Sequence, residues 1–276
     1  MNTRSKARFV VATSVMAMAS TTFAQAFFES GNTGTFDTST WTTDRFTPGT
    51  WQPGSTDPIG GQALKLGVSN ADRSDLRSPS FSGTFYNTQG RTQQTSLGQG
   101  WEVGGELYIP TSWSEAGNLR RSDLWTRDTN TVENNASYPI IGFTNANAAD
   151  PFNPAAPLAP RFRVWDSSSG WIDSTATVNY DQYNSFKIKD TGSSYEYYIN
   201  GVLTQTLTGA GYSQSGAEGL SAVFLEAYNF GDSSNVSSLP DSGYDTYWRN
   251  VYAVPSPGSA ALLSLSGLTM MRRRRR

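Results

Sequence analysis

Short β-favouring runs separated by turn residues fill residues 27–253, and this block shows no long helical periodicity. The clearest local signal is a pair of such runs, Tyr195–Ile199 and Val202–Leu207, on either side of Asn200-Gly201. Asn-Gly suits both positive-φ positions of a type I′ turn, whose twist matches that of antiparallel strands. The pattern predicts a β-hairpin, and repeated short strands over one block predict a single all-β sandwich or jelly roll.

The run Trp101–Ile109 also alternates, and Pro110 ends it. Trp101, Val103, Gly105, Leu107 and Ile109 fall on one face, which predicts the core side of a strand. We expect Trp101, Phe186 and Phe224 to be core residues. Further strands are predicted at 63–68, 139–144, 161–166, 171–178, 185–189, 220–229 and 245–253, with long loops at 112–137, 145–160 and 231–244.

Residues 160–208 resemble the laminin G / concanavalin A-like jelly roll. The resemblance rests on Gly170-Trp171-Ile172, then Tyr183-Asn184-Ser185-Phe186-Lys187-Ile188, then the hairpin around Asn200-Gly201. It implies a concanavalin A-like β-sandwich. It does not imply one activity, because the superfamily includes lectins, adhesion modules and glycosidases.

The first 26 residues have the layout of a secretory signal peptide. Three basic residues (Arg4, Lys6 and Arg8) precede an apolar stretch at 9–19. Ala24-Gln25-Ala26 is an A-x-A cleavage site, so cleavage after Ala26 would place the mature start at Phe27.

The last 23 residues, 254–276, have the layout of a second sorting signal. An apolar run at 259–271 would rise about 20 Å as a helix, against about 30 Å of hydrocarbon core. The basic cluster after it would act as a positive-inside stop. It consists of Arg272, Arg273, Arg274, Arg275 and Arg276, and the motif before the run is Val254, Pro255, Ser256, Pro257 and Gly258.

This tail resembles the PEP-CTERM sorting signal, with Ser256 where the commoner form has Glu. The resemblance implies an exosortase-type transpeptidase and the secretion machinery as partners, transient insertion into the inner membrane, and delivery to the cell envelope or exopolysaccharide matrix. The alternative is a C-terminal anchor that is kept. With both ends removed, 13 basic residues stand against 23 acidic ones, a net charge of −10. Such a body disfavours nucleic acid as a partner.

The chain contains no cysteine and no histidine. This excludes thiol nucleophiles, a Ser-His-Asp triad and histidine-bound zinc. The E-x-D-x-x-E glucanase signature is missing too. Glu102 and Glu106 are about 13 Å apart on an extended strand, too far for a retaining dyad. Glu226 stands alone in an apolar strand, so no catalytic residue is assigned.

Aromatic and oxygen-bearing side chains are the remaining candidates for binding. Exposed aromatic rings can stack on sugars, although most such rings in a sandwich fill its core. Carboxylate and amide oxygens in one loop could bind calcium, although a solvated loop explains them equally well. The stacking candidates are Trp113, Trp125, Trp165, Trp171 and Tyr212, and the calcium candidates are Asp232, Asn235, Asp241 and Asp245.

Two export signals and no assembled catalytic set predict a non-catalytic exported surface or matrix protein that binds polysaccharide or acts in adhesion. The alternative is an extracellular carbohydrate-active enzyme, a glycoside hydrolase or lyase, on the same fold.

Overall fold

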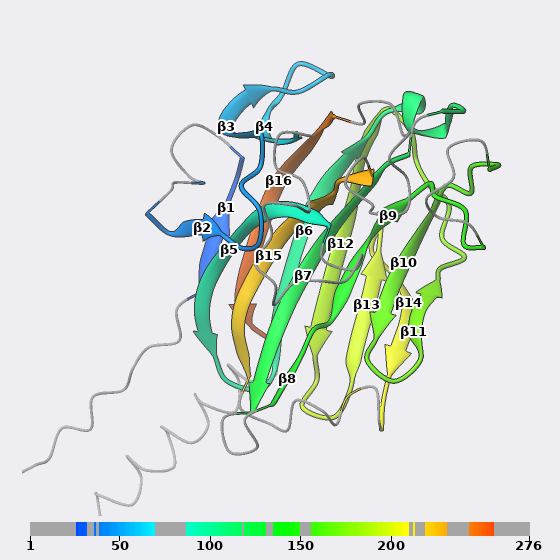
Figure 1. Ribbon diagram of the computed structural model, residues 1–276. Coiled ribbons are helices and arrows are strands. Elements are labelled where there is room, and N and C mark those ends of the chain that lie inside the picture. The colour runs from blue at the N-terminus through cyan, green and yellow to red at the C-terminus, as the bar shows by residue number, and fades with distance from the viewer. Residues whose placement is uncertain are drawn as a thin grey trace, which may run out of the picture.

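The computed structural model describes residues 26–31, 36, 39–69, 87–117, 119–130, 135–149, 156–209, 212, 219–230 and 243–256. Two antiparallel sheets pack face to face in these residues (Figure 1). This is the predicted all-β jelly-roll sandwich. No helix in the described part of the chain is long and apolar enough to cross a membrane.

Sheet A has the strand order β14-β13-β12-β6-β16-β4-β3, and β1 also pairs with β16. Its strands are β1 (Phe27–Glu29), β3 (Thr50–Thr56), β4 (Gln62–Val68), β6 (Trp101–Ile109), β12 (Gln182–Asp190), β13 (Tyr195–Ile199), β14 (Val202–Leu207) and β16 (Tyr244–Pro255).

Sheet B has the order β11-β10-β9-β7-β15-β5-β2, and β8 also pairs with β7. Its strands are β2 (Trp41–Thr43), β5 (Thr88–Leu97), β7 (Arg121–Asn130), β8 (Asn135–Ser137), β9 (Ile140–Thr144), β10 (Arg161–Asp166), β11 (Gly170–Asp173) and β15 (Leu220–Tyr228). A short 3-10 helix, η4 (Thr111–Ser114), follows β6.

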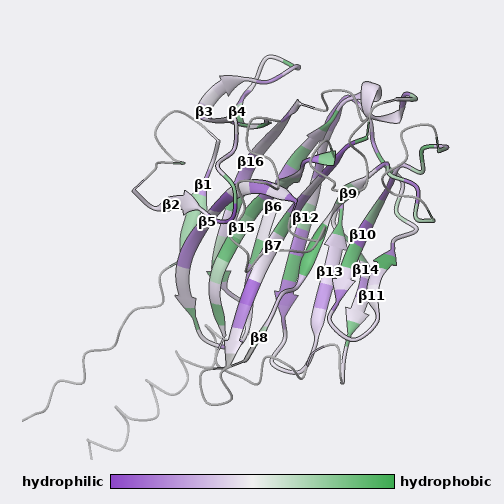
Figure 2. Cartoon of the chain, viewed as in Figure 1, coloured by the Kyte–Doolittle hydropathy of each residue, from purple (hydrophilic) through white to green (hydrophobic). Residues whose placement is uncertain are grey.

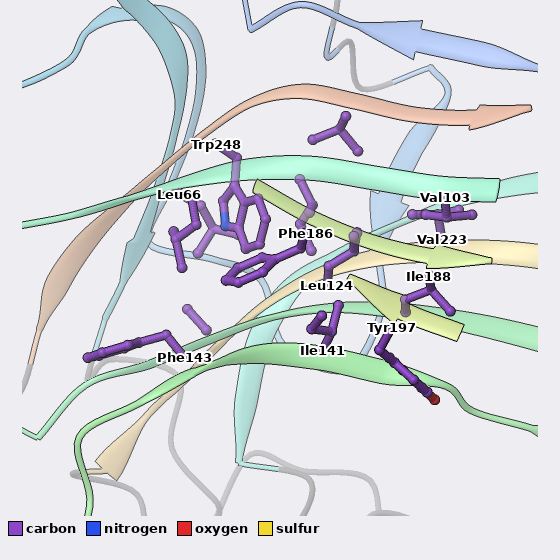
Figure 3. Packing of buried hydrophobic residues seen from close by; sticks show 14 of the residues in the cluster. Leu66, Val103, Leu124, Ile141, Phe143, Phe186, Ile188, Tyr197, Val223 and Trp248 are labelled. Carbon is purple, nitrogen blue, oxygen red and sulfur yellow. The ribbon is translucent and has the colours of Figure 1, made fainter. Parts of the chain in front are cut away.

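The core lies between the two sheets, where alternate residues of each strand meet (Figure 3). Trp248 and Phe186 of sheet A pack with ring centroids 6.0 Å apart, and Leu124 of sheet B lies beside Phe186. Hydrophobic and hydrophilic segments alternate along the strands (Figure 2), as expected when one face is buried. The other face of each sheet is therefore where functional side chains can stand.

The structure confirms the hairpin. β13 pairs with β14, and Asn200 and Gly201 have φ values of 51° and 78°. The predicted core face of β6 is also confirmed, since Trp101 and Leu107 are fully buried. Asn and Gly fit the positive φ because the one has a short polar side chain and the other has none.

The prediction of a loop at 112–137 is wrong, because the whole of β7 lies within it. The inward side chains of β7 include Ser122 and Thr126, both fully buried, so the strand lacks the apolar alternation that marks a half-buried strand. The strand predicted at 171–178 is shorter, since β11 ends at Asp173.

Strands also stand at both ends of the described chain. β1 begins at Phe27, the residue after the predicted signal cleavage site, whereas Ala24 lies outside the described residues. At the other end β16 extends beyond 253, so that Val254 pairs with Glu102 and Pro255 pairs with Trp101. The Ser256 amide donates to the Gly100 carbonyl at 2.7 Å. The sorting motif thus begins inside the folded domain, while Pro257, Gly258 and Arg272–Arg276 lie outside the described residues.

Candidate functional site

The outer face of sheet B brings together side chains that the sequence scatters over more than one hundred residues. Residues directly opposite each other on neighbouring strands share a face. The registers of β5, β15, β7, β9, β10 and β11 therefore define rows of side chains that run across the sheet. Two rows matter for function, and we call them the carboxylate row and the tryptophan row.

The carboxylate row has Glu226 of β15 opposite Asp123 of β7 at its centre. Glu226 is fully buried and Asp123 is 1% exposed. Glycines flank the pair and ionic side chains continue the row. In order, the row is Gly90, Glu226, Asp123, Gly142, Arg163 and Asp173.

The flanking glycines make room for the two carboxyl groups. A Cβ placed on Gly142 would overlap Asp123 Oδ1, and one on Gly90 would lie 2.8 Å from the Glu226 carboxyl carbon. The two carboxyl groups therefore lean away from each other, each over a glycine of the next strand. Strands are spaced about 4.8 Å apart, so the groups are separated by more than one spacing and less than three, roughly 5–14 Å.

The two carboxyl groups have different surroundings. Asp123 Oδ2 is 2.5 Å from Arg121 Nε, a buried ion pair. The nearest cation to Glu226 is Arg45 Nη2 at 3.5 Å, which is longer than a good hydrogen bond. Burial raises the pKa of Glu226 to about 8; Arg45 opposes this rise and Asp44 reinforces it. Glu226 therefore keeps its proton at neutral pH.

Arg45 covers this part of the row. Its guanidinium lies 4.5 Å from the centre of the Trp125 ring and donates to Thr88 Oγ1 at 2.8 and 3.0 Å. Its Nη1 also pairs with Asp44 at 2.8 Å. The Arg45 side chain is therefore held over both Glu226 and Trp125.

The tryptophan row lies two residues along each strand from the carboxylate row, about 7 Å away. It consists of Thr92, Phe224, Trp125, Ile140, Trp165 and Trp171. Trp165 and Trp171 are half-buried and meet edge to face at 5.1 Å. They offer apolar surface beside the carboxyl pair. Phe224 belongs to this row and is 3% exposed, which confirms the prediction that it is a core residue. It packs with Trp125, Ile140 and Ala222 in a separate cluster.

The five predicted stacking residues thus separate into two groups. Trp125, Trp165 and Trp171 lie together in the tryptophan row. Trp113 is 3% exposed and packs against Phe143 in the core, so its ring is not available to a sugar. Tyr212 packs on Tyr195 and its hydroxyl donates to Asp190, which also makes it structural.

Of the predicted calcium ligands, Asp232, Asn235 and Asp241 lie outside the described residues. Asp245 belongs to β16 and pairs with Lys65 at 2.8 Å. No group of three or more acidic side chains suited to a metal occurs within the described ranges. Calcium binding stays a prediction.

Sequence reasoning missed Asp123 and treated Glu226 as a lone acid. The structure pairs them because β7 and β15 are neighbours in the sheet although they are about one hundred residues apart in sequence. Within β7, Arg121, Asp123 and Trp125 alternate with Ser122 and Leu124, so both faces mix polar and apolar residues and neither predicts a strand.

No protein-family model matches the chain, and no curated protein matches it by sequence. Among solved structures, the apo Crh5 transglycosylase aligns with a TM-score of 0.50 and 11% identity, over 85% of each chain. A structure from work on the endo-acting O-glycanases with which human gut bacteria initiate mucin breakdown also reaches 0.50, at 11% identity, over 83% of this chain and 98% of its own. A Bacillus licheniformis β-glucanase reaches 0.47 at 13% identity, over 83% and 97%. At these identities the likeness shows the fold alone.

The comparisons nevertheless contradict the prediction of a non-catalytic surface protein that is not an enzyme. The two structures at a TM-score of 0.50 come from carbohydrate-acting enzymes.

Proposed function

We propose that this chain is an exported carbohydrate-active enzyme that hydrolyses glycosidic bonds on the outer face of sheet B. The observation that supports this most directly is the facing pair Glu226 and Asp123, buried side by side next to a row of tryptophans. Glycoside hydrolysis needs two carboxyl groups in different protonation states on either side of the scissile bond. Sugar rings stack on aromatic faces, for which the half-buried Trp165 and Trp171 are placed.

Glu226 is the general acid in this proposal. With a pKa of about 8 it holds a proton at neutral pH and can give it to the glycosidic oxygen as the bond to the anomeric carbon breaks. Asp123, ion-paired with Arg121, is the general base that takes a proton from the attacking water. The water oxygen forms the new bond to the anomeric carbon, and the leaving sugar departs as an alcohol.

The lean of the two carboxyl groups favours inversion at the anomeric carbon. Retaining enzymes hold their carboxyl groups about 5 Å apart, whereas inverting enzymes leave about 6.5–9.5 Å for a water. Side chains that lean apart over Gly90 and Gly142 leave more than one strand spacing between them. We therefore expect the first product to have the anomeric configuration opposite to that of the bond cleaved.

Sugar can reach Glu226 only after the Arg45 side chain moves off Trp125. Arg45 lies over both residues, and Glu226 has no exposed surface. In the proposed reaction the sugar ring takes the place of the guanidinium on the indole face. The positive charge then leaves the carboxyl group, which keeps Glu226 protonated for the acid step.

The test is hydrolysis of a panel of neutral and acidic polysaccharides, followed by mass spectrometry and reducing-end release. Glu226→Gln and Asp123→Asn should each lower kcat/KM at least 100-fold. Glu106→Gln is the matched control, because Glu106 lies on the outer face of sheet A and pairs with Arg249. The proposal is overturned if no polysaccharide is cleaved, or if both site variants keep the activity of the control.

We also propose that the two terminal signals export and sort the enzyme to the cell envelope or matrix. The support is the A-x-A site ending at Ala26 and the motif, apolar run and arginine cluster of 254–276. Intact-mass analysis of the surface form should show a chain that starts at Phe27 and lacks Arg272–Arg276. A surface form that keeps the five arginines would refute processing and leave the retained anchor.

A further inference from the structure

A pocket of about 330 Å³ opens beside the carboxylate row on the outer face of sheet B. Three arginines converge on it, Arg121 from β7 and Arg161 and Arg163 from β10. Asp173 is the one carboxylate among its lining residues, which also include Trp171 and Tyr228. We call this the arginine pocket.

Two of the arginines have donor groups without a partner. Arg121 is 6% exposed, and its Nε is used by Asp123 while its Nη2 has no hydrogen-bond partner among the described residues. Arg163 Nε is likewise buried without a partner in the described part of the chain. Buried donors are nearly always satisfied in folded proteins, so donors left over in a pocket indicate a ligand.

Arg161, in contrast, is held by an ion pair with Asp173 and by two backbone carbonyls, although its Nε lacks the geometry of a hydrogen bond. Its Nε lies 2.6 Å from Asp173 Oδ1, and its Nη1 donates to the carbonyls of Ala146 and Ala159, both at 2.7 Å. Arg161 therefore neutralises Asp173, the one carboxylate that lines the pocket, and Arg121 and Arg163 are left to face the pocket interior. Asp123 neutralises part of the Arg121 charge from the edge of the pocket.

Aromatic rings hold the guanidinium groups of Arg121 and Arg163 in place. Arg163 stacks on Trp171 at 3.7 Å, and Arg121 lies 4.8 Å from Trp171 and 5.0 Å from Tyr228. A guanidinium held flat on a ring presents its N–H groups in a fixed fork that matches a planar carboxylate. Burial is the main cause, and the nearby Arg121 the next, of a fall in the pKa of Arg163 to about 9. The pocket lacks the negative charge that would balance these cations.

We propose that the arginine pocket binds the carboxylate of a uronate residue in an acidic polysaccharide, with Arg121 and Arg163 as its ligands. This rests on the proposed function, because it makes the pocket a sugar subsite next to the Glu226–Asp123 pair. The volume suits a sugar rather than a bare ion, and pockets of roughly 300 Å³ are at the small end of those that bind organic ligands. Residue Arg121 joins the two sites, since it pairs with Asp123 and lines the pocket.

The net charge of the body restricts where an acidic ligand can bind. The body 27–253 carries 13 basic and 23 acidic residues, which repel an acidic chain in general. An acidic polysaccharide therefore binds only where cations gather, and the arginine pocket supplies such a place beside the carboxyl pair. Neutral sugars can accept hydrogen bonds from Arg121 and Arg163 through their hydroxyl oxygens, but they carry no charge to balance these cations.

The test is isothermal titration of the full folded protein with three uronate probes and their neutral methyl esters. The probes are trigalacturonate, trimannuronate and a glucuronate-containing hyaluronan tetrasaccharide. At least one acid should bind, and its methyl ester should bind at least tenfold more weakly. Sodium acetate and sodium sulfate in excess should displace the sugar only weakly. Displacement at concentrations equal to those of the sugar would instead mark a site for free anions and overturn the proposal.

Variants of Arg163 test whether the uronate binds in the arginine pocket. Arg163→Gln should lose at least tenfold in affinity for the acid and little for the ester, and Arg163→Lys should lie between because it keeps the charge but not the fork. Arg127→Gln is the matched control, since Arg127 lies on β7 of the same sheet but donates to Ser221 and Gln94 away from the pocket. Equal affinity for acids and esters, or equal losses in the Arg163 and Arg127 variants, would overturn the proposal. Should Arg163→Gln unfold, the lysine variant and the ester comparison still decide.

The outcomes also separate this inference from the proposed function. Uronate binding without cleavage would support the pocket and refute hydrolysis. Cleavage that yields an unsaturated sugar would support the pocket and replace hydrolysis by elimination. Cleavage of neutral chains with no preference for uronates would support hydrolysis and refute the pocket.

Discussion

The outer faces of the two sheets both carry acidic and basic side chains, but these charges are solvated on sheet A and buried on sheet B. On sheet A the ion pairs Arg249–Glu106, Lys187–Glu102 and Lys189–Glu196 have side chains that are 16–34% exposed. On sheet B, Glu226, Asp123, Arg45 and Arg121 have side chains at most 7% exposed. Solvated pairs need no special geometry, whereas buried charges are costly unless they are fully paired. The incomplete pairing on sheet B is therefore the part of the molecule that calls for a functional explanation.

The largest difference should come from breaking one ion pair on each face. Asp123→Ala leaves Arg121 buried without its anion and should lower the free energy of unfolding by about 3–5 kcal/mol. Glu106→Ala on sheet A should cost about 1 kcal/mol or less, because Arg249 stays solvated and stacked on Tyr183. Urea denaturation of both variants measures this. Equal losses would show that the two faces do not differ in the way described.

The next effect is a pH dependence that belongs to Glu226. Its folded-state pKa of about 8 is raised above the ordinary value of 4.5, so folding favours the protonated form. The stability that depends on this proton is fully present below pH 4.5 and is lost as the pH rises through 8. Glu226→Gln cannot ionise at this position, so its free energy of unfolding should change less between pH 6 and 9 than that of the unmodified protein. The two changes should differ by a few kcal/mol at most. Thermal unfolding at several pH values is the measurement, and identical pH profiles would contradict it.

Alanine in place of a glycine tests how tightly side chains are packed on each outer face. A Cβ on Gly142 of sheet B would meet backbone, with Ser122 O at 2.5 Å, as well as the Asp123 carboxyl. A Cβ on Gly104 of sheet A would meet the Tyr252 ring at 2.6 Å, and that side chain can turn away. Gly142→Ala should therefore cost about 2–3 kcal/mol and Gly104→Ala about 1 kcal/mol. Chemical denaturation of both variants measures these costs. A larger cost for Gly104→Ala than for Gly142→Ala would be evidence against a tightly packed carboxylate row.

The smallest effect concerns a cross-strand pair on sheet A. Lys189 Nζ and Glu196 Oε2 are 3.6 Å apart, with side chains 30% and 23% exposed. A double-mutant cycle with alanine at both positions should give a coupling of about 0.2–1 kcal/mol that shrinks in high salt. A coupling above 2 kcal/mol would mean that this face also holds charges in a fixed arrangement.

The sequence predicted the features that depend on local chemistry. Asn200-Gly201 fixes a turn because few residues tolerate positive φ, and the alternation around Trp101 marks a strand with one apolar face. These signals hold whatever the rest of the chain does. The strand β7 escaped prediction because its buried residues are mainly polar, and buried polar residues are recognisable only once their partners are known. Ser122, for example, donates to the Glu226 carbonyl and accepts from the Trp248 indole.

The sequence by itself determined the fold class and the chemistries that a chain without histidine or cysteine excludes. It also predicts two terminal sorting signals. These follow from residue type and spacing along the chain. Only the tertiary structure decided which carboxyl groups meet. Glu226 and Asp123 become neighbours because β15 and β7 pair in sheet B, and Arg121 and Arg163 converge because β7 and β10 both flank β9. Pairing between strands far apart in sequence depends on the packing of both sheets, so no local pattern could have revealed it.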